Sequence, residues 1–366
     1  MNFLNTGDII AKEGYRIAPN LKARILEASK LFNEGMNASN SFAGARLQEA
    51  FSTSDFPILL GKAFDVETLQ SYQDTPSEWQ KIAVEKKVKD FEKKKLVDLF
   101  GGKDYLDDVA EKEEYKARDL EESEAFFKVG KTGNTFGLSW ELRLRREFSD
   151  LADFPGRLGA AARVTEDQKV FEAFVSATGP NVEFFKTANG NAPSNKKLTR
   201  DNLKAAYIAI TKRKNGEKNP ISWGGGALQL VIPRTLLFEA EAALLPMVPD
   251  PAGGNVSIPN VLNGKFEIVV SDRIAVIDQS ANVDTTWYIL PPKNTPRPAL
   301  IKGTLIGNEQ PDIRVKRDQG ERTGGGAVAI DDGSFNDDTI WYRARHATGG
   351  AAIFGDATYA STGTTA

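Results

Sequence analysis

Apolar residues recur at helical spacing near the start of the chain. Leu21, Ile25, Ala28 and Phe32 lie three or four residues apart, which predicts a short helix with one apolar stripe. Residues 33–45 are small and polar, as is typical of a linker. Because such a helix must bury its stripe, two arrangements are open: an arm that projects onto another molecule, or a helix that folds back on its own domain.

The next pattern is a long, highly charged stretch with few apolar positions. Lysines are dense from Trp79 to Leu96, and carboxylates mixed with lysines dominate residues 106–129. The aromatic and β-branched residues among them favour strands over a disordered tail, so we predict a two-stranded hairpin with its tip near Asp119–Glu124. A helix with a solvated charged face is the alternative for Trp79–Leu96. An isolated hairpin is marginal in water, so this one should lie on another surface, and its mixed charge suits a second copy of the chain.

Two further segments have helical periodicity. The first, residues 156–176, follows Pro155, which is tolerated in a first helical turn. The second opens at Thr199 and runs to about Arg213. The predicted apolar faces are Val164, Gln168, Phe171 and Val175 in the first helix, and Leu203, Tyr207 and Ile210 in the second.

From residue 228 onward the pattern changes to strands and turns. Leu228–Ile232 is a continuous apolar run, typical of a buried strand, and Pro233 then starts a short helix. Alternating or apolar runs predict further strands at residues 266–270, 286–290, 313–315 and 338–346. We therefore predict a mixed α+β chain.

Composition excludes several classes of protein. The 366 residues include 47 Lys and Arg against 50 Asp and Glu, a net charge of −3, whereas a dedicated nucleic-acid binder needs a strong basic excess to neutralise phosphates. The absence of cysteine and the single histidine, His346, exclude disulfides, thiolate catalysis and zinc sites built from Cys or several His. No apolar run approaches the ~20 residues of a membrane span. The start of the chain lacks a secretory-signal pattern, so we expect the protein to work, or to be assembled, in a cytoplasm.

Candidate catalytic and cofactor motifs are incomplete. Gly130-Lys131-Thr132 lacks the earlier glycine of a phosphate-binding loop, because Ala125 stands there, and a hairpin turn is the better interpretation. The triple-glycine stretches lack dinucleotide spacing and suit positive-φ turns. Residues 331–338 are acidic but lack the ligand pattern of a calcium loop, which favours a solvated turn. His346 has no Gly-x-Ser-x-Gly partner motif and is interpreted as structural. We therefore expect no cofactor, no metal site and no enzyme activity.

Short motifs follow one another along residues 50–362. They are Phe56–Leu60 (FPILL), Trp79–Ala83 (WQKIA), Val88–Phe91 (VKDF), Val109–Glu111 before Glu114–Tyr115, Phe136–Ser139 (FGLS), Leu158–Ala162 (LGAAA), and Trp341–Ala344 (WYRA) leading into Gly349–Gly350. In this order the chain resembles the major capsid proteins of tailed bacteriophages, which have the Hong Kong 97-type fold. Within that family it is most similar to the branch of the Mu-like prophage major head subunit.

The resemblance implies a domain organisation. The extended hairpin would be the family's E-loop, and the helix near residues 155–176 its long spine helix. The peripheral domain would be discontinuous, and the C-terminal segment would rejoin the axial domain around the symmetry axis of the capsomer. The implied parts are an N-terminal arm (1–55), the peripheral domain (56–99, 141–199 and the return strand 331–346), the E-loop (100–140) and the axial domain (200–330 and 347–366).

The resemblance also implies a function. The family assembles hexamers and pentamers into an icosahedral head that encloses double-stranded DNA without reading its sequence. The implied partners are other copies of the chain and portal, scaffolding and decoration proteins, with no membrane; the implied location is the virion, assembled in the bacterial cytoplasm. Candidate inter-subunit contacts in the E-loop are Lys116, Arg118, Asp119, Glu121, Glu122, Glu124 and Lys128, and Lys128 with Asn336 is a candidate cross-linking pair.

Two other interpretations stay open. An encapsulin-like nanocompartment has the same fold but encloses protein cargo. A soluble hydrolase or binding module would use His346 with a neighbouring Asp, and would form a small discrete oligomer instead of particles.

Overall fold

The computed structural model describes residues 4, 6–11, 18–36, 41–51, 55–97, 108–109, 111–112, 114, 122–139, 141, 149–214, 220, 223–249, 257–295, 297–316, 323 and 334–365. The chain divides into two compact units. Unit 1 comprises Met1–Pro76, Lys131–Thr165 and Gly307–Ala347, and unit 2 comprises Ser77–Gly130, Glu166–Ile306 and Thr348–Ala366.

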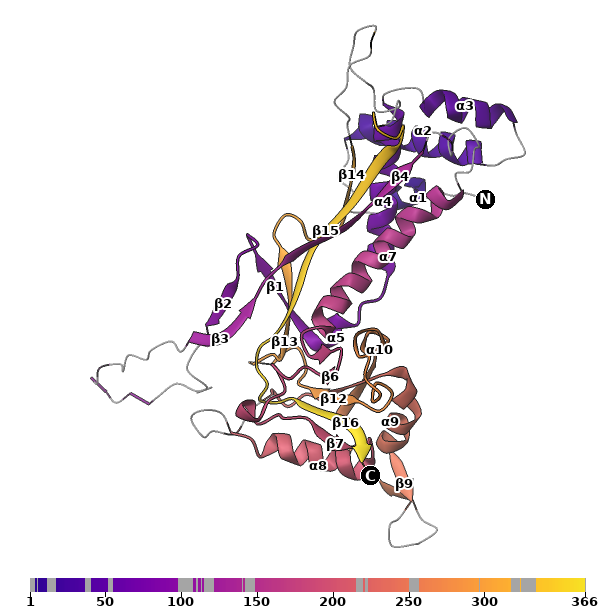
Figure 1. Cartoon of the computed structure of the whole chain (residues 1–366). Coiled ribbons are helices and arrows are strands. Elements are labelled where there is room, and N and C mark those ends of the chain that lie inside the picture. Colours follow the sequence, from indigo (N-terminus) through magenta and orange to yellow (C-terminus); the bar gives the residue numbers. More distant parts are fainter. Residues whose placement is uncertain are drawn as a thin grey trace. The chain divides into compact units, whose positions relative to one another are not determined.

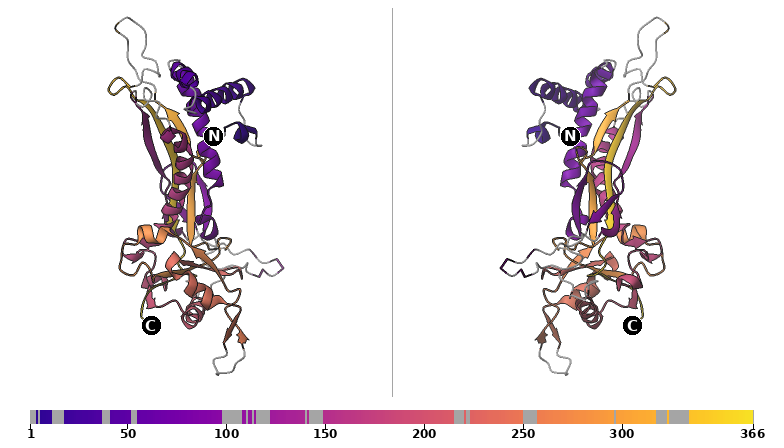
Figure 2. Two further views of the ribbon diagram at one scale, coloured as in Figure 1. Left: turned by 90° about the vertical axis from the view of Figure 1, so that its right-hand side faces the viewer. Right: turned by 90° about the vertical axis from the view of Figure 1, so that its left-hand side faces the viewer.

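Unit 1 packs helices on one face of a small sheet. Its helices are α1 (Thr6–Ala11), α2 (Pro19–Met36), α3 (Ser41–Phe51), α4 (Phe56–Asp74) and most of α7 (Ser149–Phe171). Its strands are β4 (Gly130–Leu138), β14 (Asp312–Val315) and the first part of β15 (Ile340–Ala352), and β15 pairs with both of the others. Figures 1 and 2 show α4 and α7 lying along these strands.

The core of unit 1 is aromatic. Phe64 of α4 meets Phe32 of α2 and Tyr342 of β15 edge to face, with ring centroids 6.1 and 5.6 Å apart, and Phe136 of β4 stacks on Tyr342 at 5.1 Å. Because Ile25 and Phe32 are buried in this core, α2 packs on its own unit. The folded-back arrangement is therefore the one observed, and the interpretation of this helix as a projecting arm is wrong.

Unit 2 is built on a five-stranded mixed sheet with the order β11-β8-β12-β16-β7. Central strands β8 and β12 have only buried residues, as expected where both faces of a sheet are covered. β8 is parallel to β11 and antiparallel to β12, and β16 is antiparallel to β12 and parallel to β7. The strands are β7 (Ser194–Lys196), β8 (Leu228–Ile232), β11 (Phe266–Val270), β12 (Trp287–Leu290) and β16 (Tyr359–Thr365).

Smaller elements complete unit 2. Strand β1 is parallel to β13, which is antiparallel to the last part of β15. Two-stranded pairs are formed by β2 with β3, β5 with β6, and β9 with β10. The bounds are α5 (Trp79–Ile82), β1 (Ala83–Val88), β2 (Lys94–Val97), β3 (Glu122–Phe127), β5 (Val175–Ser176), β6 (Gly179–Pro180), η2 (Thr187–Asn189), α8 (Arg200–Thr211), η3 (Arg234–Leu236), α9 (Leu237–Leu244), β9 (Met247–Pro249), β10 (Ser257–Pro259), α10 (Arg273–Ile277) and β13 (Leu300–Leu305).

Strong local signals are confirmed. Helix α8 begins after Thr199, whose side chain accepts a hydrogen bond from the Asn202 N–H and caps the helix. Strands β8, β12 and β14 fall where apolar runs predicted them. Gly224 and Gly225 have φ of 77° and 75°, the positive values expected for a glycine turn. The helical alternative for Trp79–Leu96 is wrong beyond Ile82, because strands β1 and β2 follow.

Helix boundaries were predicted less well. The supposed linker, residues 33–45, overlaps the start of α3, which buries Leu47 in the core of unit 1. Helix α7 starts at Ser149, so Pro155 lies inside it, and it ends at Phe171 instead of residue 176. Phe171 and Val175 are buried as predicted, but Val164 is 37% exposed, because the buried face also runs through Glu166 and Val170. The apolar pattern did not indicate this part of the buried face, because the face includes the charged residue Glu166.

Two further predictions need correction. Gly130-Lys131-Thr132 opens strand β4 and is not a hairpin turn. Glu122 pairs with Val97, so Glu122–Glu124 belongs to strand β3 and the hairpin tip is not at Asp119–Glu124. The small polar C-terminal segment, for which no strand was predicted, forms β16. It pairs with β12 through backbone hydrogen bonds, which its side-chain pattern does not indicate.

Candidate functional site

The predicted E-loop contact residues lie on and beyond a short β-ladder in unit 2. Lys94 pairs with Phe127 and Val97 with Glu122 across β2 and β3, with a register irregularity between them. Glu122 and Glu124 are on β3, and Lys128 follows it with an exposed side chain. Lys116, Arg118, Asp119 and Glu121 lie outside the described residues. The structure therefore fixes the base of the hairpin.

The other predicted cross-linking residue, Asn336, lies in unit 1. It is exposed in the turn at residues 334–337, and its backbone N–H donates to Ser334 Oγ at 3.3 Å. The described part of the acidic segment is thus an exposed turn, as predicted; residues 331–333 lie outside the described residues.

His346 is 4% exposed on β15, with its ring 5.7 Å from that of Tyr72 in an edge-to-face arrangement. Tyr72 in turn carries the Arg163 guanidinium 4.0 Å above its ring. The Thr132 hydroxyl donates to the His346 carbonyl oxygen at 3.2 Å. His346 is thus packed inside unit 1.

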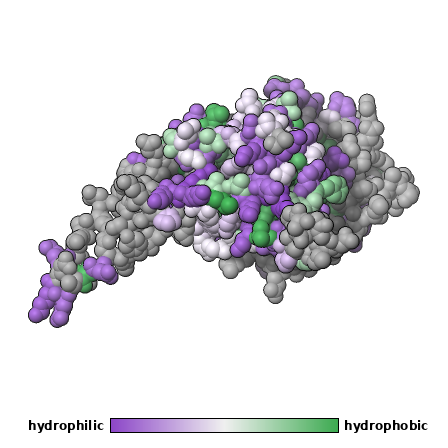
Figure 3. Space-filling view, turned by 90° about the horizontal axis from the view of Figure 1, so that it is seen from below, coloured by the Kyte–Doolittle hydropathy of each residue, from purple (hydrophilic) through white to green (hydrophobic). Residues whose placement is uncertain are grey.

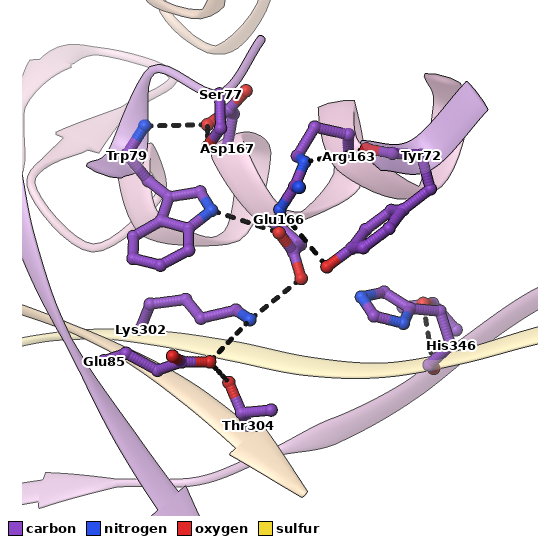
Figure 4. A network of polar contacts seen from close by, with 11 residues as sticks. Tyr72, Ser77, Trp79, Glu85, Arg163, Glu166, Asp167, Lys302, Thr304 and His346 are labelled. Atoms are coloured by element: carbon purple, nitrogen blue, oxygen red, sulfur yellow. Dashed lines mark hydrogen bonds and ion pairs between the residues drawn. The ribbon is translucent and has the colours of Figure 1, made fainter. Parts of the chain in front are cut away.

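Sequence reasoning missed a buried polar cluster in unit 2 (Figure 4). The Lys302 ammonium lies 2.9 Å from Glu166 Oε1, and these side chains are 2% and 0% exposed. Glu85 Oε1 lies 3.4 Å from the same ammonium, and the Trp79 indole N–H donates to Glu166 Oε2 at 3.1 Å. Nothing in the sequence distinguishes Lys302 and Glu166 from the many exposed Lys and Glu.

Asp167, the neighbour of Glu166, caps helix α5. Its Oδ1 accepts hydrogen bonds from Ser77 Oγ at 3.2 Å, the Glu78 N–H at 3.0 Å and the Trp79 N–H at 2.8 Å. Burial raises the pKa of Asp167 to about 6 even though these donors act to lower it. Burial likewise raises the pKa of Glu78, which accepts from Ser271 Oγ. Since its carboxylates are held by fixed donors, the cluster is equipped to stabilise the packing of α5 and α7.

Several large apolar side chains of unit 2 are exposed. Phe238 and Leu245, within and just after α9, are 78% and 52% exposed, Met247 of β9 is 50% exposed, and Val261 is 68% exposed. Figure 3 shows hydrophobic side chains interrupting a mainly hydrophilic face in several places. Such side chains are suited to contacts with another polypeptide.

The described residues were also searched for metal sites and membrane-spanning helices. Among them no group of three or more His, Cys, Asp or Glu is arranged to hold a metal ion. In the same part of the chain, no helix combines the length and the apolar character that crossing a membrane requires.

Comparisons with known proteins define the class. The family model described as phage capsid protein matches residues 122–361, well over half of the chain. This match makes the molecule a structural protein of a viral shell. The chain belongs to the phage capsid protein family, and the prediction of a mixed α+β capsid fold of the Hong Kong 97 type is confirmed. Membership makes it a component of the virion that self-assembles with other copies.

Solved structures are similar at low identity. The capsid of cyanophage P-SCSP1u has 12% identity and a TM-score of 0.46, with 78% of this chain and 87% of that chain covered. The mature capsid of bacteriophage PhiM1 has 10% identity and a TM-score of 0.44, covering 78% and 86%. A virus-like particle from Pyrococcus furiosus has 12% identity and a TM-score of 0.38, covering 81% and 97%. No curated protein sequence matches the chain.

Proposed function

We propose that the protein is the major capsid subunit of a tailed-phage head, of the Mu-like prophage type, whose hexamers and pentamers close an icosahedral shell around double-stranded DNA. The observation that carries this proposal is the family match over residues 122–361. Portal, scaffolding and decoration proteins would be its partners, and assembly would take place in the bacterial cytoplasm. The net charge of −3 suits a container, because a strongly basic lining would grip the DNA.

The domain assignment is part of the proposal. Residues 56–99, 141–199 and 331–346 would be the peripheral domain, with α7 as the spine helix. Residues 200–330 and 347–366 would be the axial domain, a pairing supported by β16, which adds to the sheet of β8 and β12. The exposed Phe238, Leu245, Met247 and Val261 would then be covered by neighbouring subunits.

Inter-subunit contact is assigned to the hairpin of residues 100–140. Lys116, Arg118, Asp119, Glu121, Glu122, Glu124 and Lys128 would contact the next subunit. A covalent cross-link between Lys128 and Asn336 would form when the Lys amine attacks the Asn side-chain carbonyl and ammonia leaves. Both side chains are exposed, so they are accessible to a neighbouring copy. Denaturing electrophoresis of assembled particles tests this step: cross-linked ladders should disappear in Asn336→Ala, and their absence from the unmodified protein would refute it.

Electron microscopy of the expressed chain tests assembly. We expect closed icosahedral shells, and in the phage context DNA-filled heads with a portal. A small discrete oligomer at high concentration would overturn the capsid assignment. Shells whose native content is protein would retain the shell role but overturn the DNA-container role.

A further inference from the structure

A groove of about 500 Å³ lies on unit 1, over strands β4, β14 and β15. It is lined by Thr135, Arg314, Lys316, Trp341 and Arg343, with parts of the residues between them. Side chains alternate across a strand, and the neighbours Ile340, Tyr342 and Ala344 point into the core of unit 1. Trp341 and Arg343 therefore belong to the face that the helices leave open. We call this feature the cationic groove.

Like charges face each other in the cationic groove. Arg314 and Arg343 are direct partners across β14 and β15, and the Lys316 N–H donates to the Trp341 carbonyl oxygen one step further along. Like charges directly opposite each other on a sheet are destabilising unless an anion is shared between them. An anion bound on this face of the sheet would therefore reduce the repulsion between Arg314 and Arg343.

The next step of the same ladder shows which anion these cations take. Asp312 faces Arg345, whose Nε and Nη2 donate to Oδ1 and Oδ2 at 3.0 and 3.2 Å, and Arg314 Nε donates to Oδ2 at 2.7 Å. A carboxylate joining two arginines is thus already part of this face. Although burial acts to raise it, the hydrogen bonds from Arg314 and Arg345 hold the pKa of Asp312 below its usual value.

Two cations of the groove lack such a partner. Within the described part of the chain, neither Lys316 nor Arg343 forms an ion pair, and both side chains are exposed. Between them, half-buried Trp341 donates its indole N–H to Asp337 at 3.2 Å, which leaves carbon surface toward the groove. The site therefore offers two free cations beside an aromatic wall.

The geometry favours a ligand lying across the face over a strand added at the edge. The outward Ile313 N–H of β14 already donates to Asp65 Oδ1 at 2.9 Å. Asp312 and Asp337 flank the free cations and would repel a continuous phosphate backbone, whereas separate carboxylates on a peptide can avoid them. Residues 107–124 of the chain itself are a less suitable ligand. Their carboxylates alternate with Lys112, Lys116 and Arg118, whose positive charges would be repelled by the groove.

We propose that the cationic groove docks an acidic peptide segment of a separate partner protein, with carboxylates on Arg343 and Lys316 and an apolar side chain on Trp341. The full-length protein is tested by fluorescence anisotropy with a labelled peptide of alternating Glu and Val. Arg343→Gln with Lys316→Gln should weaken binding at least about tenfold, the effect of losing a charge-assisted hydrogen bond. The matched pair Lys204→Gln with Lys212→Gln, on exposed positions of α8 and its C-cap, should change it little.

The outcomes separate the competing occupants. Equal affinity of the groove variant and the unmodified protein overturns the site. Tighter binding of a peptide of residues 107–124 overturns the separate partner in favour of a second copy, and displacement of the Glu-Val peptide by single-stranded DNA overturns it in favour of nucleic acid. Shell formation, followed in parallel by electron microscopy, should be the same for both variants, so failure of this proposal is distinguishable from failure of the capsid assignment.

Discussion

Lys302 is a lysine that unit 2 has removed almost entirely from water. Its partner Glu166 is fully buried, and the Trp79 ring centroid lies 5.0 Å from the ammonium. A buried ion pair adds little net stability, but removal of one partner strands the other charge in a medium that solvates it poorly. Single-residue effects in this protein should therefore be largest where a charge is left alone.

Replacing Lys302 by Met should lower the free energy of unfolding by about 3–5 kcal/mol, because Glu166 then remains buried without a counter-charge. Urea denaturation measures the change. Adding Glu166→Gln, which retains an acceptor for the Trp79 indole, should recover most of the loss. Lys86→Met on the exposed face of β1 is the control. A double variant no more stable than Lys302→Met would contradict this account.

Asp167 should make stability depend on pH. Its folded pKa of about 6 lies above the unfolded value of 3.8, so between these values the folded state binds more protons. The stabilisation is complete below about pH 4 and is lost as the pH rises through about 6, an effect of at most about 3 kcal/mol.

Asp167→Asn isolates that effect, because an Asn oxygen can accept the same three hydrogen bonds without a charge. The unfolding free energy of the unmodified protein minus that of the variant should fall between about pH 4 and 6 and be level above about 7. Asp153→Asn, on an exposed position of the same helix, should show no such step. A flat difference for Asp167→Asn would exclude Asp167 as its source.

At the scale of elements, glycine sets how closely α7 approaches α4 within unit 1. A Cβ on Gly159 would overlap the Thr68 carbonyl oxygen and lie 2.7 Å from Ser71 Cβ and from the Tyr72 nitrogen. Gly156, one turn earlier in the same helix, has no atom within 4 Å of its Cβ position. At Gly159 the backbones of the two helices can therefore approach this closely only because the side chain is absent.

This contrast predicts opposite effects of one substitution. Gly156→Ala should stabilise the protein by roughly 0.5–1 kcal/mol, because alanine is the better helix former. Gly159→Ala should destabilise it by about 1–3 kcal/mol or more, because α7 must move away from α4. Thermal unfolding of the pair checks the prediction, and equal melting temperatures would refute the close packing.

At the scale of the whole molecule, the surfaces that we assign to contacts are separate from the cores of the two units. Each unit has its own core of buried apolar side chains, while the contact surfaces we assign lie outside those cores. Such surfaces gain their stabilisation only when copies meet, so assembly and folding should respond to different substitutions.

Deleting residues 118–121, which immediately precede β3, should separate assembly from folding. We expect an unchanged melting temperature, because the segment lies outside the described cores, together with loss of closed shells in electron micrographs and sedimentation. The control replaces exposed Asp201 and Lys204 on α8 with Asn and Gln. Normal particles from the deletion variant would disprove the contact role of the hairpin.

How far the sequence predicted this fold depended on the kind of signal. Strand β8 and the cap at Thr199 were found because their signals are local. The start of α7 was missed because helix formation continues through Pro155 when neighbours stabilise it. Strand β16 was missed because its residues are small and polar, and its pairing with β12 supplies what its own pattern lacks.

The candidate surfaces also differ in whether the sequence alone could predict them. Charged positions in the hairpin were visible in the sequence, whereas the cationic groove was not, because Arg314 and Arg343 are far apart in the chain and meet only through strand register. The same holds for Lys302 and Glu166, which look like surface residues in a linear pattern.

The sequence by itself determined the mixed α+β character, the exclusion of cysteine and multi-histidine chemistry, and the motif order that resembles capsid proteins. Those properties are local or compositional, so neighbouring residues suffice to state them. Only the tertiary structure decided that α2 packs on its own unit, that Asp167 caps α5, and that like charges face each other on β14 and β15. Each of these depends on which distant segments come into contact, and burial and register then set the energy of every charge involved.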